Sequence, residues 1–240
     1  PPRPPPTPNP LLLLDRLAGR YPDCFRFLFE PAPGVAFYGA TPELLAEVKG
    51  AALRTVALAG SIRRGATLAE DHTLGAQLLA NPKERREHAL VVQAIEASLR
   101  PLTSRLCVPE TPGLLPLSNI QHLHTPIEGE LAEASGILPV VEALHPTPAV
   151  GGLPRETALA AIRESEPLPR GWFAAPICWL DSQGNGLFAV AIRSAVSRGC
   201  ETRLFAGAGI VADSDPEREW HETHLKLRPL LEALGGALAG

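Results

Sequence analysis

Residues 172–227 carry the clearest structural pattern in the chain and read WFAAPICWLDSQGNGLFAVAIRSAVSRGCETRLFAGAGIVADSDPEREWHETHLKL. Apolar runs at 172–180 and 187–196 flank a turn rich in Gly and Asn at 182–186, which predicts a long hairpin. A further strand is expected at 202–211. Asp215 followed by Pro216 is typical of a helix start, so a final helix should follow these strands.

Upstream of this segment, helix and strand signals alternate without a regular rhythm. Polar caps followed by proline at Asn9 and Asn81 mark two helix starts. The expected helices lie at 10–19, 68–80, 82–99, 136–144 and 154–164. The expected strands or extended segments lie at 25–30, 35–38, 52–58, 103–108 and 114–130. Strand runs with helices inserted between them, and no βαβ repeat, predict an α+β fold with antiparallel or mixed sheets.

Composition narrows the range of functions. The chain has 240 residues, 45% of them hydrophobic, and a formal net charge of −4, so it can bury a sizeable core and lacks the basic footprint of a nucleic-acid-binding protein. Its apolar runs are too short to cross a bilayer. The four cysteines are widely spaced, which disfavours a zinc site or a disulfide framework and favours a cytoplasmic location.

The proline-rich start of the sequence and its lack of methionine suggest how the chain is organised. Residues 1–10, PPRPPPTPNP, favour an extended polyproline conformation, and we interpret them as a linker or domain edge, with a PxxP ligand as the alternative. Residues 11–240 are expected to form one domain. The sequence contains no methionine, so we expect it to be part of a longer chain that extends upstream.

Acidic residues on two predicted helices are candidate metal ligands. On the last helix, Glu219, Glu222 and Lys226 share one face. On the helix that follows Asn81, Glu84 and Glu87 lie near the start of an apolar stripe. Carboxylate oxygens suit a hard divalent cation, but acids also favour helix starts because of the helix dipole. Periodicity alone leaves both interpretations open.

Other residues stand out singly. Arg193 lies within an apolar strand, where a buried guanidinium needs a partner, either a structural acid or a substrate carboxylate. Gly207 and Gly209 in AGAGIV indicate a close approach by a ligand or another backbone. His145 lies at a bend followed by two prolines, and such a histidine has a structural or a catalytic role.

Six stretches together resemble the isochorismate synthases of the chorismate-utilising enzyme family, which also includes anthranilate, salicylate and aminodeoxychorismate synthases. They are GATPELL (39–45), LAGSIRRG (58–65), KERREHALV (83–91), LHPTPAVGG (144–152), GNGLFAVAIRSA (184–195) and LFAGAGIVADSDPEREWHETHLKL (204–227). The resemblance implies a layered β-core with outer helices, whose N-terminal part is missing here, and a Mg²⁺-dependent conversion of chorismate to isochorismate. In that reaction water adds at C2 while the C4 hydroxyl leaves.

The resemblance also implies roles for individual residues. Glu87 and Glu222 would hold Mg²⁺ against the ring carboxylate of chorismate, with Glu219 as a further acid nearby. Glu43 would be the general acid that protonates the departing hydroxyl, which requires a raised pKa. Arg193 would pair with the enolpyruvyl carboxylate. The expected further substrate contacts are Gly60, His145, Gly207, Gly209 and Lys226.

One position separates the subfamilies. Ala59 stands where aminodeoxychorismate synthases resembling PIKGT carry a nucleophilic lysine, so the resemblance favours water as the nucleophile. No glutamine amidotransferase subunit, nucleic acid or membrane partner is expected. Salicylate synthases, which go on to eliminate pyruvate, are the nearest enzymatic alternative. The product would feed menaquinone or siderophore synthesis, and the sequence leaves both open.

One expected residue is missing from the sequence. The family activates water with a lysine in a KVVLAR-like strand, but the lysines here are Lys49, Lys83 and Lys226, and none lies in such a segment. Two hypotheses follow. The chain is the C-terminal majority of an isochorismate synthase domain, which we favour because the acids and Arg193 are retained, or it is a non-catalytic or partner-dependent chorismate-binding fragment.

Overall fold

The computed structural model describes residues 8–235. The helices are α1 (Pro10–Arg20), α2 (Leu68–Ala80), α3 (Pro82–Leu99), the 3₁₀ turn η1 (Arg100–Leu102), α4 (Ile137–Leu144), α5 (Pro148–Gly151), α6 (Arg155–Ser165) and α7 (Pro216–Leu234). The strands are β1 (Phe25–Ala32), β2 (Val35–Thr41), β3 (Leu44–Lys49), β4 (Ala52–Arg63), β5 (Thr103–Cys107), β6 (Gly113–Pro116), β7 (Ile120–Leu131), β8 (Pro176–Leu180), β9 (Gly186–Val190), β10 (Ser194–Arg198) and β11 (Glu201–Phe205).

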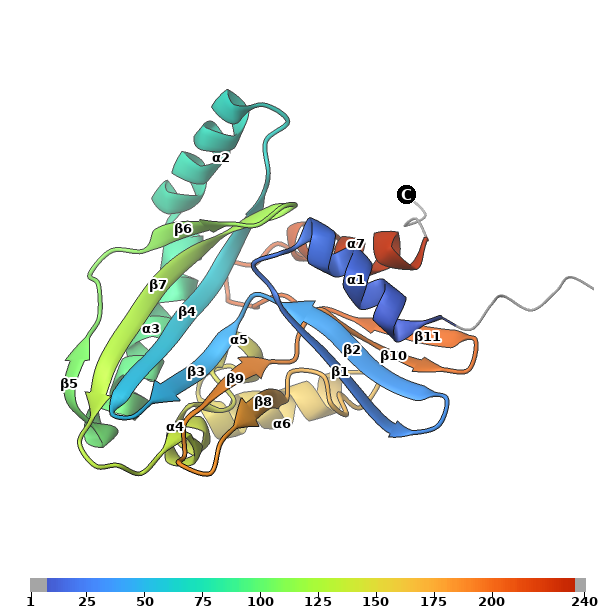
Figure 1. The fold of residues 1–240 in the computed structure, drawn as a ribbon. Coiled ribbons are helices and arrows are strands. Elements are labelled where there is room, and N and C mark those ends of the chain that lie inside the picture. Colours follow the sequence, from blue (N-terminus) through green and yellow to red (C-terminus); the bar gives the residue numbers. More distant parts are fainter. Residues whose placement is uncertain (1–7, 236–240) are drawn as a thin grey trace, which may run out of the picture.

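The strands form two antiparallel sheets, which confirms the predicted α+β class. The smaller sheet has the order β1-β2-β10-β11, and the larger has the order β5-β7-β4-β3-β9-β8, with β6 also paired to β7. Figure 1 shows the larger sheet at the left and the smaller one at the lower right. Each sheet therefore contains strands from both ends of the chain.

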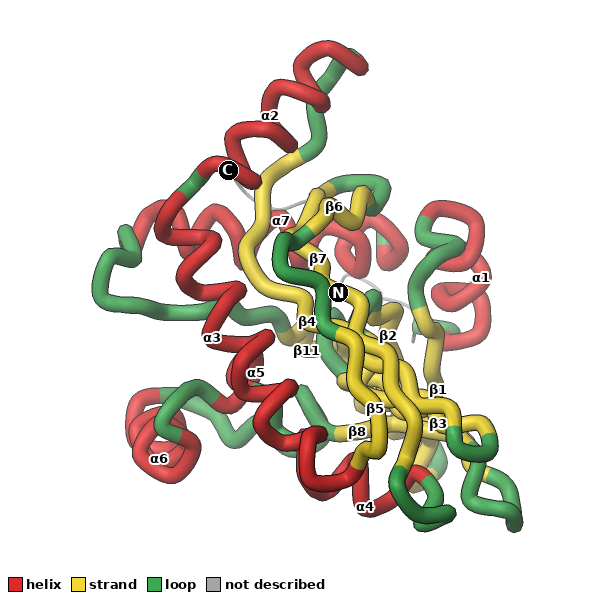
Figure 2. The backbone as a smooth tube through the Cα atoms, turned by 90° about the vertical axis from the view of Figure 1, so that its left-hand side faces the viewer, coloured by secondary structure: helices red, strands yellow, loops and turns green. Residues whose placement is uncertain are grey.

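Helices cover the two sheets separately. Helices α3 and α4 pack on the larger sheet through a core that includes Val91, Ile95 and Val140, and Figure 2 shows both helices on one side of the strands. Helices α1 and α7 pack on the smaller sheet through Leu17 and Leu230, among others. The two helix layers bring α3 and α7 toward the region between the sheets.

The predicted helix starts are confirmed by their caps. The Asn9 side chain accepts hydrogen bonds from the first amides of α1, Asn81 does so for α3, and Asp215 accepts from the Arg218 amide of α7. In each case proline occupies the first helical position, where no backbone donor is needed. These local signals set the axes of the two helices that later supply acidic groups.

Two strand predictions are wrong in an informative way. The strand expected at 187–196 is split into β9 and β10, which belong to different sheets, because the chain turns at Arg193 with φ of +50°. The strand expected at 202–211 ends at Phe205, and AGAGIV forms a loop that faces α3 instead of pairing with a neighbour. Alternating small and apolar residues fit either arrangement, so the pattern could not separate them.

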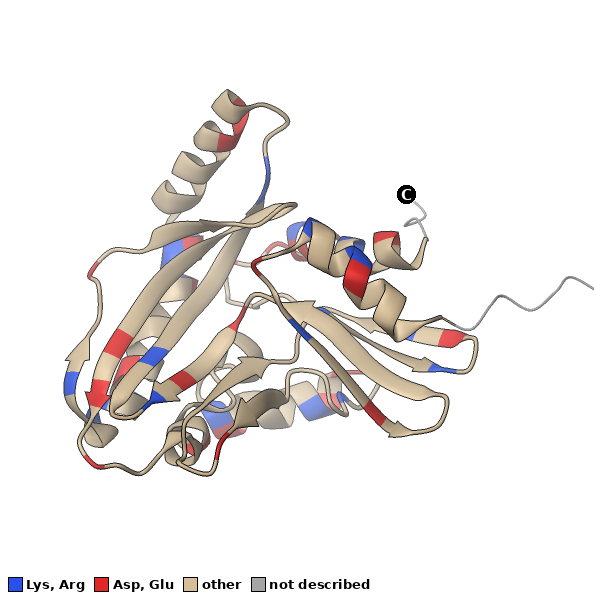
Figure 3. Cartoon of the chain, viewed as in Figure 1, with Lys and Arg blue, Asp and Glu red and all other residues tan. Residues whose placement is uncertain are grey.

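The remaining differences are smaller. Strand β3 was not predicted, β4 extends to Arg63 rather than ending at residue 58, and a break at 117–119 separates β6 from β7. The Pro-rich segment interpreted as a linker falls mostly outside the described residues. Within residues 8–235, no helix is both long and apolar enough to cross a membrane. Acidic and basic residues are interspersed along the ribbon in the view of Figure 3.

Candidate active site

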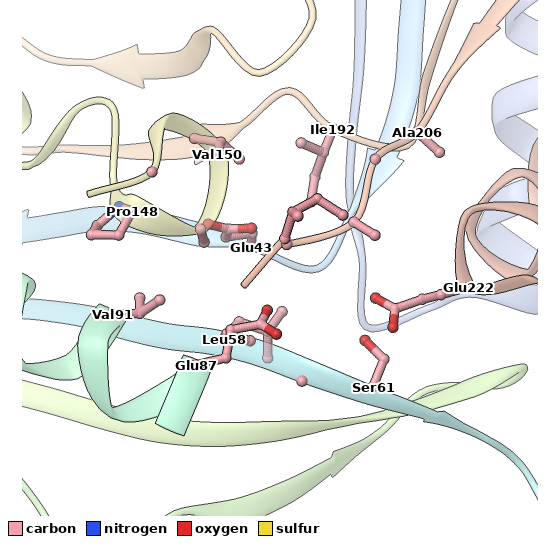
Figure 4. A pocket seen from close by; sticks show the side chains of 18 of the residues that line it. Glu43, Leu58, Ser61, Glu87, Val91, Pro148, Val150, Ile192, Ala206 and Glu222 are labelled. Atoms are coloured by element: carbon pink, nitrogen blue, oxygen red, sulfur yellow. The ribbon is translucent and has the colours of Figure 1, made fainter. Parts of the chain in front are cut away.

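A cavity of about 480 Å³ lies where the two sheets, α3, α7 and the loop after β11 come together. Glu43, Glu87 and Glu222 all line it, although they come from three separate parts of the chain. Figure 4 shows the three carboxylates directed into the same space, with Ser61 beside Glu222. Other predicted site residues that line the cavity are Gly60, Arg193, Gly207, Gly209 and Lys226.

Glu43 lies where the chain passes from β2 into β3 and is almost completely buried, with 5% of its surface exposed. Burial raises its pKa from 4.5 to about 7, against the opposing effects of Lys226 and Arg193. Its carboxyl group can therefore hold a proton near neutral pH. This is the property expected of a general acid in this pocket.

Arg193 is buried at the crossing between β9 and β10. Its Nη2 donates a 2.6 Å hydrogen bond to Nε2 of His122, while Nε has no partner among the described residues. Burial and the nearby Arg193 hold the pKa of His122 well below its usual range. His122 is therefore neutral, with its proton on Nδ1, which lies 2.9 Å from Oγ of Ser61.

Lys226 and Glu222 form an ion pair on one face of α7, with Nζ 2.6 Å from Oε1 of Glu222. The same ammonium donates a 2.9 Å hydrogen bond to the backbone oxygen of Gly207. The loop after β11 is thereby tied to α7. The helical spacing in the sequence predicts that Glu222 and Lys226 share one face of the helix, and the structure confirms this.

Glu87 lines the cavity from α3, whereas Glu222 lines it from α7. A methyl group at Gly209 would come within 2.3 Å of Glu87 Oε1, so the loop can approach this carboxylate only because residue 209 has no side chain. Burial raises the pKa of Glu87, as do the neighbouring carboxylates of Glu84 and Glu222, against the effect of Lys83. Two carboxylates of like charge that face one cavity favour a cation between them.

Carboxylate oxygens at Glu87 and Glu222 fit a hard divalent cation in donor type and in their shared direction. Within residues 8–235, no group of three or more His, Cys, Asp or Glu side chains forms a ready-made metal cluster. The site is therefore a pair of acids that a substrate carboxylate could complete.

Glu219 is brought close to this pair but does not line the same cavity. Its Oε1 lies 2.8 Å from Nζ of Lys83, which also contacts Glu84 and Glu87 at 3.2 Å. Burial lowers the pKa of Lys83, but the three carboxylates outweigh this effect and raise it overall. Lys83 is therefore a firmly charged ammonium at the centre of an acidic cluster.

His145 is the one predicted substrate contact that does not line the cavity. Its backbone oxygen accepts a hydrogen bond from Arg155, and burial lowers the pKa of its ring. The residues that follow it, Pro148 and Val150 of α5, do line the wall. In this structure His145 supports the segment that forms the wall.

Sequence reasoning missed His122 and Ser61. His122 lies in β7 and Ser61 in β4, beside a bulge at Gly60. Glu84, one of the acids on the helix that follows Asn81, is 8% exposed and continues the buried face of α3. Its position seven residues before Val91 on that face was the available signal.

Comparison with known proteins identifies the family. Residues 5–235 match the family model described as chorismate binding enzyme. The salicylate biosynthesis isochorismate synthase of Pseudomonas aeruginosa is 52% identical over 198 residues, which cover 82% of this chain and 42% of that protein. Isochorismate synthase MenF of Bacillus subtilis is 48% identical, covering 85% of this chain and 43% of that protein.

Solved structures agree with this result. MenF, the menaquinone-specific isochorismate synthase of Escherichia coli, matches with a TM-score of 0.85 at 37% identity, covering 94% of this chain and 53% of that one. Anthranilate synthase component I of Streptococcus pneumoniae matches with a TM-score of 0.81 at 26% identity, covering 93% and 50%. The chain spans about half the length of the curated relatives it matches. By sequence and by fold, it belongs to the chorismate-binding enzyme family.

Proposed function

We propose that the protein has the activity of an isochorismate synthase, an isomerase that converts chorismate to isochorismate. The observation that carries this proposal is the convergence of a protonatable Glu43 and the cationic Arg193 and Lys226 with Glu87 and Glu222 in one cavity. A dianionic substrate with a departing hydroxyl needs these groups together: cations for its carboxylates and a proton donor for its leaving group.

The proposed binding mode follows from the charges in the cavity. Arg193 would receive the enolpyruvyl carboxylate, because its unpartnered Nε and its fork of donors suit a planar carboxylate. His122 would hold the guanidinium in place through their hydrogen bond. The ring carboxylate would lie at the end of the cavity formed by Glu87 and Glu222, where Mg²⁺, when bound, would neutralise the repulsion between these acids and the substrate.

Glu43 would act on the C4 hydroxyl. Its proton passes to that oxygen as the C–O bond breaks, so that water leaves and Glu43 becomes a carboxylate. A second water forms the new bond at C2 and loses a proton to a base. Burial raises the pKa of Glu43 to about 7, so the carboxyl group can carry this proton near neutral pH.

None of the three lysines in the sequence is free to be that base. Lys83 and Lys226 are held in ion pairs with acids, and Lys49 lies exposed at the end of β3, paired across the strand with Ala52. We therefore expect residues 1–240 to bind chorismate but to convert it slowly. Water as nucleophile requires no glutamine amidotransferase partner.

Product analysis tests this function. The protein is incubated with chorismate and Mg²⁺ for long enough to detect slow turnover, and the products are separated by chromatography. Isochorismate as the accumulating product supports the proposal. Accumulation of salicylate and pyruvate would assign the chain to the salicylate synthases, and unchanged chorismate would favour a binding role without catalysis.

A further inference from the structure

The ammonium group of Lys83 lies among three carboxylates from two helices. Nζ is 2.8 Å from Oε1 of Glu219 on α7, and 3.2 Å from Oε1 of Glu84 and from Oε2 of Glu87 on α3. The Lys83 side chain is only 19% exposed, and its partners are 10% to 16% exposed. This geometry resembles a cation with its oxygen ligands more than a surface ion pair.

The cluster depends on this one positive charge. Two buried carboxylates and the half-buried Glu87 would repel one another at this spacing and penalise the approach of α7 to α3. Lys226 does not relieve them, because it is paired with Glu222. Lys83 is therefore the counter-ion of this acidic cluster.

Glu87 belongs both to the proposed metal site and to the cluster of acids around Lys83. It lines the substrate cavity and is the ligand expected for the divalent cation, yet its Oε2 already contacts Lys83. A divalent cation at Glu87 would lie within a few ångströms of the ammonium, where repulsion between positive charges in a half-buried site is strong. The two cations therefore compete for the negative charge of this carboxylate.

We propose that Lys83 is an internal counter-cation that competes with the divalent metal for Glu87 and moves toward Glu84 and Glu219 when the metal binds. This inference rests on the magnesium site of the proposed function. Oε2 of Glu84 is buried and has no partner among the described residues, so it offers the displaced ammonium an acceptor. A second cavity of about 510 Å³, lined by Lys83, Glu84 and Glu219, provides room for this movement.

The test compares Lys83→Gln with the native protein and with Lys49→Gln. Glutamine keeps a polar side chain of similar width and removes the charge, while Lys49 is exposed and lines neither cavity. Mn²⁺ binding is measured from the electron paramagnetic resonance signal of the free ion, and melting temperature is measured with and without Mg²⁺. We expect Lys83→Gln to bind Mn²⁺ about tenfold more tightly, equivalent to about 1.4 kcal/mol, and Lys49→Gln to behave as native.

Melting supplies a second readout. Without metal, Lys83→Gln should melt about 5 °C or more below the native protein, because three clustered acids lose their counter-ion. Mg²⁺ should restore most of this loss, since it replaces the missing charge. A loss of stability that Mg²⁺ does not reduce would contradict the proposal.

Each binding outcome decides a different question. Equal or weaker Mn²⁺ binding by Lys83→Gln overturns the competition while leaving the metal site of the proposed function intact. No Mn²⁺ binding by any variant rejects the metal site and the competition with it. If Lys83→Gln does not fold, Lys83→Arg is used: its rigid guanidinium should hold Glu87 more firmly and weaken Mn²⁺ binding several-fold, and native or tighter binding by that variant would reject the idea.

Discussion

Glu43 and Arg193 occupy the two points at which the chain crosses between the sheets, and the two crossings are tied into neighbouring strands. The amide of Val190 donates a 3.0 Å hydrogen bond to the backbone oxygen of Glu43, and the amide of Ala40 donates a 3.3 Å hydrogen bond to the backbone oxygen of Arg193. The proposed acid and the proposed carboxylate-binding residue are thereby built on the folded core rather than on surface loops. Such placement preorganises a site.

The buried Glu43 should make stability depend on pH. Its folded pKa of about 7 exceeds the ordinary value of 4.5, so its contribution is fully favourable below pH 4.5 and is lost as pH rises through 7. The difference corresponds to about 3 kcal/mol. Glu43→Gln, which is neutral at every pH, should therefore melt above the native protein at pH 8 while losing the proton donor.

The comparison is made by thermal melting at pH 5 and pH 8. The difference in melting temperature between Glu43→Gln and the native protein should be larger at pH 8 than at pH 5. A gap that does not change with pH would show that Glu43 ionises normally. A Glu43→Gln variant that keeps full turnover would remove this residue from the mechanism.

His122→Ala should act through Arg193. Without the Nε2 acceptor, the guanidinium loses the partner that fixes its direction. We expect KM for chorismate to rise about tenfold, with a smaller change in kcat, because the lost interaction orients a binding group. Steady-state kinetics of a form that turns over chorismate provide the check, and a fall in kcat at constant KM would argue against a positioning role.

Gly209→Ala should weaken metal binding with little effect on folding. The added methyl would lie 2.3 Å from Oε1 of Glu87, which is the flexible end of a side chain and can move aside. The carboxylate would then leave its position, and divalent-cation affinity should fall about tenfold. Gly207→Ala is the matched control, because its methyl meets nothing within 4 Å. Equal Mn²⁺ affinities in the two variants would exclude this steric link.

Glu87→Gln and Glu222→Gln should each abolish Mg²⁺-dependent turnover in a form that is active. An amide carries no charge and is a weaker ligand for a hard cation than a carboxylate. A loss of at least about 100-fold is expected, measured as the initial rate of chorismate consumption over a range of Mg²⁺ concentrations. Near-normal rates in either variant would refute that assignment.

The sequence predicted most of the elements because their signals are local. Helix α3 starts where Asn81 and Pro82 place it, since a cap and its first turn depend on adjacent residues alone. The split at Arg193 and the loop at Gly209 depend instead on which sheet and which side chain the backbone meets. No periodicity in the sequence encodes those distant contacts.

The site was predicted through family resemblance rather than through spacing. Local pattern placed Glu219 and Glu222 on one face of a helix, but could not bring Glu43 and Glu87 to the same cavity. The sequence did not single out His122, because this residue continues an ordinary buried face of β7 and only the folded structure shows its contact with Arg193.

The most direct measurement of the central claim is calorimetric titration of chorismate into residues 1–240, with and without Mg²⁺. The geometry predicts weak binding that strengthens when Mg²⁺ is present and is lost in Arg193→Ala, with little conversion of the ligand during the titration. Absence of binding, or binding indifferent to both Mg²⁺ and Arg193, would contradict the assignment of this cavity as the chorismate site.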